Sequence, residues 1–239
     1  MILNVRGSLG TQVMEYLVGL AQLQMTGHEL EEIHINTKDT ADHSKVDYLS
    51  QIFDLGVSVQ FVDDTKKVGC FKKENLEILI KYFSDVKKEA LWRMKRDFLF
   101  RSSHLLFHYR NGDRKCLPDS FYRQLWGIYS HDFQDDALFI GNDHQRIEEL
   151  YYPMYKNNLL KSNSPVADWY SCMYSDLVIG GFSMFTISAA VLGRNRTKIY
   201  INKDNPVVSE SDIISLRYLS DSFNITTIEV NENEIRTCN

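Results

Sequence analysis

Proline and glycine are scarce in this sequence of 239 residues, which contains 4 and 12 of them. This scarcity argues against a disordered, collagen-like or linker-dominated chain. The four cysteines are scattered and form no C-x-x-C pair, so neither a disulfide framework nor a zinc site is indicated. No run of about 18 apolar residues occurs, and the first residues lack the features of a signal peptide. We therefore expect a cytoplasmic protein without a transmembrane segment.

Positive charge is also in short supply. The chain has 27 lysines and arginines against 32 aspartates and glutamates, which gives a formal net charge of -5. This balance disfavours a protein that binds nucleic acid over a broad surface. An anionic ligand would have to be held locally, by a few side chains and the N-termini of helices.

Several catalytic motifs are missing. The sequence has no Asp-x-Asp, no H-E-x-x-H and no clustered His/Cys pattern, so we expect no metal site. The absence of G-x-S-x-G disfavours a serine hydrolase. The G-x-G-x-x-G fingerprint is absent, which disfavours an unrelated Rossmann-like oxidoreductase, and no P-loop is present. We expect no cofactor.

The remaining composition is that of a globular protein. Hydrophobic residues make up 44% and charged residues 25% of a chain long enough to bury a substantial core. Short apolar segments predict strands at 2–5, 33–36, 57–62, 105–110, 137–141, 177–179 and 198–202. Amphipathic segments predict helices at 13–25, 74–100, 119–129, 145–151, 168–174 and 183–192. The alternation predicts an α/β fold with two Rossmann-like lobes, residues 1–100 and 101–239.

Three loops follow predicted strands, where an open α/β sheet binds its ligands. In the first loop, Gly7 and Gly10 allow backbone N–H groups to approach an anion at a helix N-terminus. A tight turn without a ligand explains the same residues. In the third loop, two glycines end a buried strand and Ser183 begins a helix. Ser183 suits an N-cap, and the same geometry suits a phosphate at the helix N-terminus.

The second loop carries the polar sequence His-Tyr-Arg-Asn-Gly-Asp at residues 108–113. Alternation along a strand places His108 and Arg110 on one face. Two such donors suit a diphosphate, since an arginine binds two oxygens at once. Asp113, just beyond the turn, is placed to orient Arg110 or to reach a reacting hydroxyl. The alternative is a histidine at a sheet edge and a surface salt bridge between Arg110 and Asp113.

Taken together and in this order, the loops resemble the motifs of the α-1,2-fucosyltransferases of glycosyltransferase family 11. The family's G-x-L-G-N-Q is similar to residues 7–12, and its H-x-R-x-G-D is matched in full at 108–113. The family's late block, two aspartates followed by Ile and a Phe-Ser pair, is similar to residues 168–183. A strand that ends in S-D-D in many members is similar to residues 139–143.

The resemblance implies a GT-B fold, in which a nucleotide-sugar donor lies between an acceptor-side first lobe and a donor-side second lobe. It implies an inverting, metal-independent transfer of L-fucose from GDP-fucose to a hydroxyl of a glycan acceptor. Catalytic roles would fall to Arg110 and His108 at the β-phosphate, with Asp113 beside them, and Asp168 would bind guanine. The donor contacts that it implies are Gly7, Gly10, Thr11, Asn142, Asp143, Asp168, Phe182 and Ser183. Alternatives are a nucleotide-sugar-binding protein without transfer activity and a glycosyltransferase with a different donor sugar.

Overall fold

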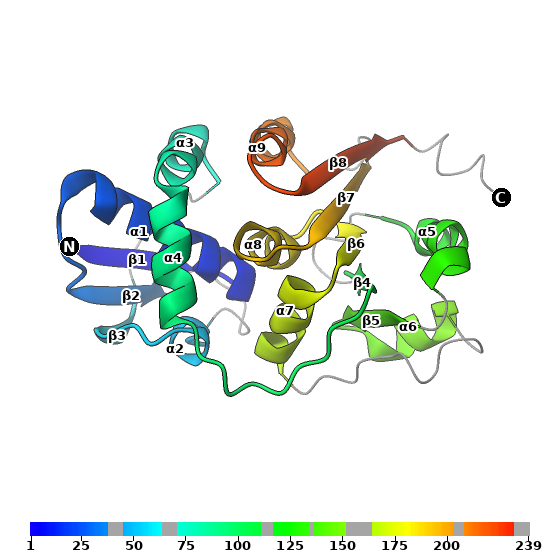
Figure 1. Cartoon of the computed structure of the whole chain (residues 1–239), viewed down its shortest axis with the longest axis horizontal. Helices are drawn as coiled ribbons and strands as arrows, with labels where there is room; N and C mark the ends of the chain where they lie inside the picture. The colour runs from blue at the N-terminus through cyan, green and yellow to red at the C-terminus, as the bar shows by residue number, and fades with distance from the viewer. Residues whose placement is uncertain are drawn as a thin grey trace. The chain divides into compact units, whose positions relative to one another are not determined.

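A computed structural model of the chain describes residues 1–37, 45–63, 71–110, 117–133, 136–151, 164–202 and 208–231. The chain divides into two compact units, Met1–Leu99 and Phe100–Asn239. Each unit has its own sheet, flanked by helices, and the paired strands run parallel (Figure 1). The predicted α/β class with parallel sheets is confirmed.

The first unit is built on a sheet in the order β1-β2-β3. Its elements are β1 (Ile2–Arg6), α1 (Leu9–Thr26), β2 (Glu32–Asn36), α2 (Leu49–Ile52), β3 (Ser58–Val62), α3 (Lys73–Lys81) and α4 (Phe83–Arg93). Alternate apolar residues of β1 and β2 lie on one face and are buried: Leu3, Val5, Ile33 and Ile35. α1 packs against β1, α3 and α4, so most of its residues are buried.

The ends of the first unit's helices differ in part from the predictions. α1 stops where the sequence predicts, at Gly27, which has a left-handed φ of 69° and donates its N–H to Leu23 O. It starts earlier than predicted, at Leu9. The predicted helix over 74–100 is confirmed as helical up to Arg93, but Tyr82, with non-helical dihedrals, divides it into α3 and α4, and the chain is extended from Met94. Beyond α4 the backbone pairs with another segment, since Lys95 N–H bonds to a carbonyl at the end of α2.

The second unit has a sheet in the order β5-β4-β6-β7-β8. Its strands are β4 (Leu105–Tyr109), β5 (Ala137–Gly141), β6 (Leu177–Gly181), β7 (Arg196–Asn202) and β8 (Ile225–Val230). Its helices are α5 (Asp119–Phe133), α6 (His144–Tyr151), α7 (Pro165–Tyr174), α8 (Met184–Leu192) and α9 (Glu210–Ser220). All residues of β4 and β6 are buried, as expected for the centre of a parallel sheet. The sequence did not predict α9 or β8.

The strand order of this second sheet reverses at β4. From β4 the chain passes to β5 on one side, and then crosses to β6 on the other side before continuing through β7 and β8 (Figure 1). In open α/β sheets, the carboxyl ends of the two strands at such a reversal form the crevice in which ligands bind. Among the strands described in the first unit, the order β1-β2-β3 contains no reversal. The topology therefore singles out the carboxyl ends of β4 and β6.

Candidate functional site

The residues that follow β4 and β6 meet at this reversal. His108 of β4 is in register with Gly180 of the parallel strand β6, so the two strands end side by side. Arg110 directly follows β4, and Ser183 follows β6 as the N-cap of α8. The Nη1 of Arg110 donates a hydrogen bond of 3.0 Å to Ser183 Oγ. Two predicted site residues from separate motifs thus form one contact.

This contact changes the electrostatics at the start of α8. Ser183 has the extended backbone of an N-cap, yet its side chain makes no cap hydrogen bond, and its Oγ accepts from Arg110 instead. The first turn of α8 contains no acidic residue. The guanidinium therefore adds a full positive charge to the positive end of the helix dipole. Main-chain N–H groups and an arginine together provide the donors that phosphate oxygens require.

His108 is sandwiched between β6 and α8. Its Nδ1 lies 2.8 Å from Thr186 Oγ1, and its ring stacks on Phe185 with centroids 5.2 Å apart. A Cβ on Gly180 would lie 3.1 Å from the His108 carbonyl oxygen, so glycine leaves the space that this residue needs. Burial, aided by the charge of Arg110, lowers the pKa of His108 to about 3. His108 is therefore uncharged at neutral pH, and Arg110 supplies the positive charge.

Replacement of Thr186 by valine is expected to destabilise the second unit by about 1–3 kcal/mol, because it leaves a buried ring nitrogen of His108 without its partner. The change preserves side-chain volume, so little of the loss would come from packing. Urea unfolding of Thr186→Val measures the effect. Thr226→Val, an exposed site on β8, is the matched control. Equal stability of the two variants would show that the contact with His108 contributes nothing.

Asp168 and Phe182 approach the same edge of the sheet from different directions. Asp168 lies in the first turn of α7. The next residue, Trp169, donates from Nε1 to Ser188 Oγ over 2.9 Å, which joins the second turn of α7 to the second turn of α8. Because α8 begins at the carboxyl ends of the strands, Asp168 lies toward that edge as well. Phe182 is 3% exposed and packs in the core directly before the N-cap.

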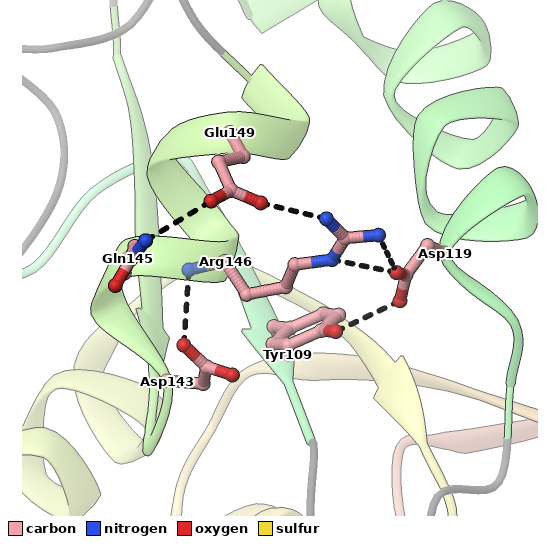
Figure 2. Close-up of polar contacts among 6 residues, drawn as sticks. All are labelled: Tyr109, Asp119, Asp143, Gln145, Arg146 and Glu149. Atoms are coloured by element: carbon pink, nitrogen blue, oxygen red, sulfur yellow. Dashed lines mark hydrogen bonds and ion pairs between the residues drawn. The ribbon is translucent and has the colours of Figure 1, made fainter.

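On the other side of β4, a polar cluster joins three elements (Figure 2). The Asp119 carboxylate at the start of α5 accepts from Tyr109 Oη over 2.8 Å and from Arg146 Nε over 2.7 Å. Arg146 also donates to Glu149 Oε2, one turn further along α6, over 2.6 Å. Asp143 Oδ1 accepts the backbone N–H of Arg146 over 3.0 Å, as an N-cap does. The cluster connects α5 and α6 to the end of β4. Asp143, which was predicted to contact the nucleotide-sugar donor, caps α6 in the structure.

Asn142 and Asp113 are the remaining predicted site residues of the second unit. Asn142 directly follows β5, between the strand and the capping residue of α6. Asp113 and the preceding Gly112 lie outside the residues that the structure describes. The role assigned to Asp113 therefore stays a prediction.

In the first unit, the predicted loop forms the N-terminus of α1. Gly7 has a φ of 78°, which a side chain would strain. Gly10 and Thr11 lie in the first turn of α1, which has no acidic residue and no side-chain cap. The amide of Gln12 donates to Gly7 O over 2.9 Å and to Val46 O over 2.8 Å, which fixes the turn. The three residues that were predicted to contact the nucleotide-sugar donor thus lie at the N-terminus of α1.

Sequence analysis missed an acidic side chain beneath this turn. Glu15 is the only charged residue of α1, and its side chain is fully buried. Its Oε2 accepts the Arg6 backbone N–H over 2.6 Å, while Oε1 lies 3.8 Å from Arg6 Nε and has no hydrogen-bond partner among the described residues. Burial raises the pKa of Glu15 to about 8, against the lowering effect of Arg6. The sequence signal that could have identified Glu15 is that it is a lone charged residue within an otherwise uncharged, largely apolar helix.

Comparison of the chain with protein-family models, curated proteins and solved structures found no match. Over the described ranges, no helix is both long enough and apolar enough to span a bilayer. The same ranges contain no group of three or more His, Cys, Asp or Glu side chains arranged to bind a metal ion. A functional interpretation therefore depends on the motifs and on the geometry at the carboxyl ends of the strands.

Proposed function

We propose that this chain is a glycosyltransferase that transfers L-fucose from GDP-fucose to a hydroxyl group of a glycan. In this proposal the two units are the lobes of a GT-B enzyme, and the second unit binds the nucleotide. The observation that carries the proposal is the contact between Arg110 and Ser183 at the strand reversal. It combines an arginine with a helix N-terminus at the place where α/β sheets bind ligands.

The chemistry of the transfer explains the need for this arrangement. The acceptor oxygen attacks C1 of fucose from the face opposite the phosphate, and the bond between C1 and the phosphate oxygen breaks with its electron pair. GDP leaves with additional negative charge, and the acceptor hydroxyl loses its proton to a base. Arg110 and the first N–H groups of α8 stabilise the charge on the leaving diphosphate. Asp113 is the base or the residue that orients Arg110 in this scheme.

The other site residues take supporting roles. His108 is uncharged, and through Thr186 it positions the first turn of α8 beside Arg110. Asp168 accepts hydrogen bonds from guanine N1 and N2, a pattern that favours guanine over uracil or adenine. The resemblance also assigns contacts with the nucleotide sugar to Gly10 and Thr11, which lie at the N-terminus of α1.

Ligand binding tests the nucleotide part of this proposal. Isothermal titration with GDP, GDP-fucose, UDP and NAD is expected to show binding of the two guanine nucleotides only. Asp168→Asn is expected to weaken GDP binding about tenfold, since it exchanges a charged acceptor for a neutral amide. Binding of NAD without binding of GDP would rule the proposal out. A further titration with GDP-mannose tests the donor sugar: binding as tight as that of GDP-fucose would show that the site does not select fucose.

A transfer assay separates an enzyme from a binding protein. The wild-type chain is incubated with GDP-fucose and a panel of galactosides, and release of GDP is compared with formation of the fucosylated product. Product formed in proportion to released GDP supports a transferase. Binding of GDP-fucose without product from any galactoside favours the alternative of a nucleotide-sugar-binding protein.

A further inference from the structure

The end of β4 is held from both faces of the sheet. Successive residues of a strand point to opposite faces. The side chains of His108 and Arg110 accordingly contact α8 and its N-cap, whereas Tyr109 points toward α5. The proposed mechanism uses the contacts with α8 and leaves those with α5 unexplained.

Tyr109 makes the polar contact with α5. It is 1% exposed, and its Oη donates a hydrogen bond of 2.8 Å to Asp119 Oδ1 at the start of that helix (Figure 2). The other oxygen of this carboxylate accepts from Arg146 Nε over 2.7 Å, so each oxygen of Asp119 has a donor of its own. Burial and the bond to Asp119 raise the pKa of Tyr109, so its hydroxyl stays protonated and remains a donor.

The peptide group between Tyr109 and Arg110 is closely packed at both of its polar atoms. The N–H of Arg110 donates a long hydrogen bond of 3.4 Å to Tyr122 Oη, from a fully buried residue of α5. The ring of Tyr122 also meets the Tyr109 ring edge-on, with centroids 4.8 Å apart. The Tyr109 carbonyl oxygen lies against Gly141 of β5, where any Cβ would collide with it. Displacement of α5 from β4 would therefore move the backbone that carries Arg110.

We propose that Tyr109 and Asp119 are positioning residues, which hold the backbone of Arg110 so that its guanidinium stays at the N-terminus of α8. A long, flexible side chain reaches one fixed point only if the backbone from which it starts is fixed as well. Ser183 holds the far end of this arginine, and the bond between Tyr109 and Asp119 holds the near end. For catalysis, the inference rests on the proposed function, which assigns the leaving diphosphate to Arg110.

NMR relaxation tests the positioning without any ligand. The Arg110 Nε–H resonance, identified by its absence from Arg110→Lys, is expected to have an order parameter above about 0.6 in the wild type and below it in Tyr109→Phe. Phenylalanine keeps the packing of the ring and removes the donor to Asp119. Tyr129→Phe is the matched control, because Tyr129 Oη is also hydrogen-bonded within this unit and its loss should leave Arg110 ordered. An unchanged order parameter in Tyr109→Phe overturns the inference.

Asp119→Ala tests the same hydrogen bond from the acceptor side. It is expected to lower the order parameter of Arg110, and addition of Tyr109→Phe to it should cause no further loss, because the bond is already absent. A further loss in the double variant would mean that the two residues act separately, which overturns their joint role. Urea unfolding of each variant confirms that the protein is folded under the conditions of the NMR measurement.

Turnover distinguishes positioning of Arg110 from a general loss of stability. Tyr109→Phe is expected to lower the turnover number about tenfold in the wild type and hardly at all in Arg110→Ala, because a misplaced arginine matters only where the arginine is present. The free energy of unfolding should fall by the same amount in both backgrounds. Equal losses of turnover in both backgrounds would show that Tyr109 does not act through Arg110, and would overturn the inference.

The two measurements also separate this inference from the proposed function. If the wild type forms no fucosylated product, the proposed function fails, and the order parameters alone decide the role of Tyr109 and Asp119. If product is formed and Arg110 is equally ordered in the wild type and in Tyr109→Phe, the proposed function stands and the inference fails.

Discussion

Glu15→Gln is expected to become more stable relative to the wild type as the pH rises, by about 3 kcal/mol between pH 5 and pH 8. Burial raises the pKa of Glu15 from 4.5 to about 8 in the folded chain. Above pH 4.5 the unfolded chain releases this proton while the folded chain retains it, so the wild type loses stability as the pH rises toward 8. The glutamine variant has no such proton and escapes this loss.

Urea unfolding of both proteins at each pH unit from 5 to 8 measures the difference directly. Glu29→Gln, at an exposed position of the same unit, controls for the removal of one negative charge. A difference between Glu15→Gln and the wild type that does not vary with pH would mean that the folded carboxyl titrates as it does in water. Because the quantity is a change with pH, it is independent of any fixed effect of the amide.

A buried acid with this energetic cost needs a reason to persist. Glutamine occupies nearly the same volume and can accept the same N–H bond from Arg6, so packing alone does not require glutamate. Residues that reduce stability are characteristic of functional sites. Glu15 lies beneath the glycine turn at the N-terminus of α1, next to the predicted site residues Gly7, Gly10 and Thr11.

The sequence predicts the central strands well and the charged surface poorly. β5 and β6 are short apolar runs that end in glycine, and this length and flanking residue favour a buried parallel strand over a helix. Residues 74–100 carry so much charge that helical and extended stretches look alike, and no Gly or Pro marks the break at Tyr82. The capping box of α9, with Ser209 and Asp212, was a signal that sequence analysis missed.

The site shows the same division between local and tertiary information. Arg110 and Ser183 are predictable one at a time, because each follows a strand that the sequence marks clearly. Their hydrogen bond is not, since it depends on β6 crossing to the free side of β4. The pKa of His108 is likewise a tertiary property, because it follows from burial under α8. Motifs thus identify the residues, and packing decides their charge and partners.

Arg110→Ala is expected to lower the turnover number for transfer by about 10²–10³-fold, the loss seen when a donor to developing charge is removed. Arg110 is half-buried and contacts Ser183, so its charge lies at the N-terminus of α8. Arg110→Lys keeps the charge but cannot bind two oxygens in a bidentate manner. Its turnover number is expected to lie between those of the wild type and Arg110→Ala. Arg194→Ala, at an exposed position of the same unit, should turn over normally. Near-normal turnover by Arg110→Ala would show that the phosphate role is misassigned.

A double-mutant cycle then tests whether Arg110 acts together with Ser183. If the hydrogen bond holds the guanidinium against the helix N-terminus, Ser183→Ala is expected to lower turnover about tenfold in the wild type and hardly at all in Arg110→Ala. Independent action would give the same loss in both backgrounds. Urea unfolding of the four proteins separates this outcome from a loss of fold, because Ser183 is also the N-cap of α8. If the two substitutions are coupled in turnover but not in stability, the hydrogen bond stabilises the transition state of the transfer and not the folded protein.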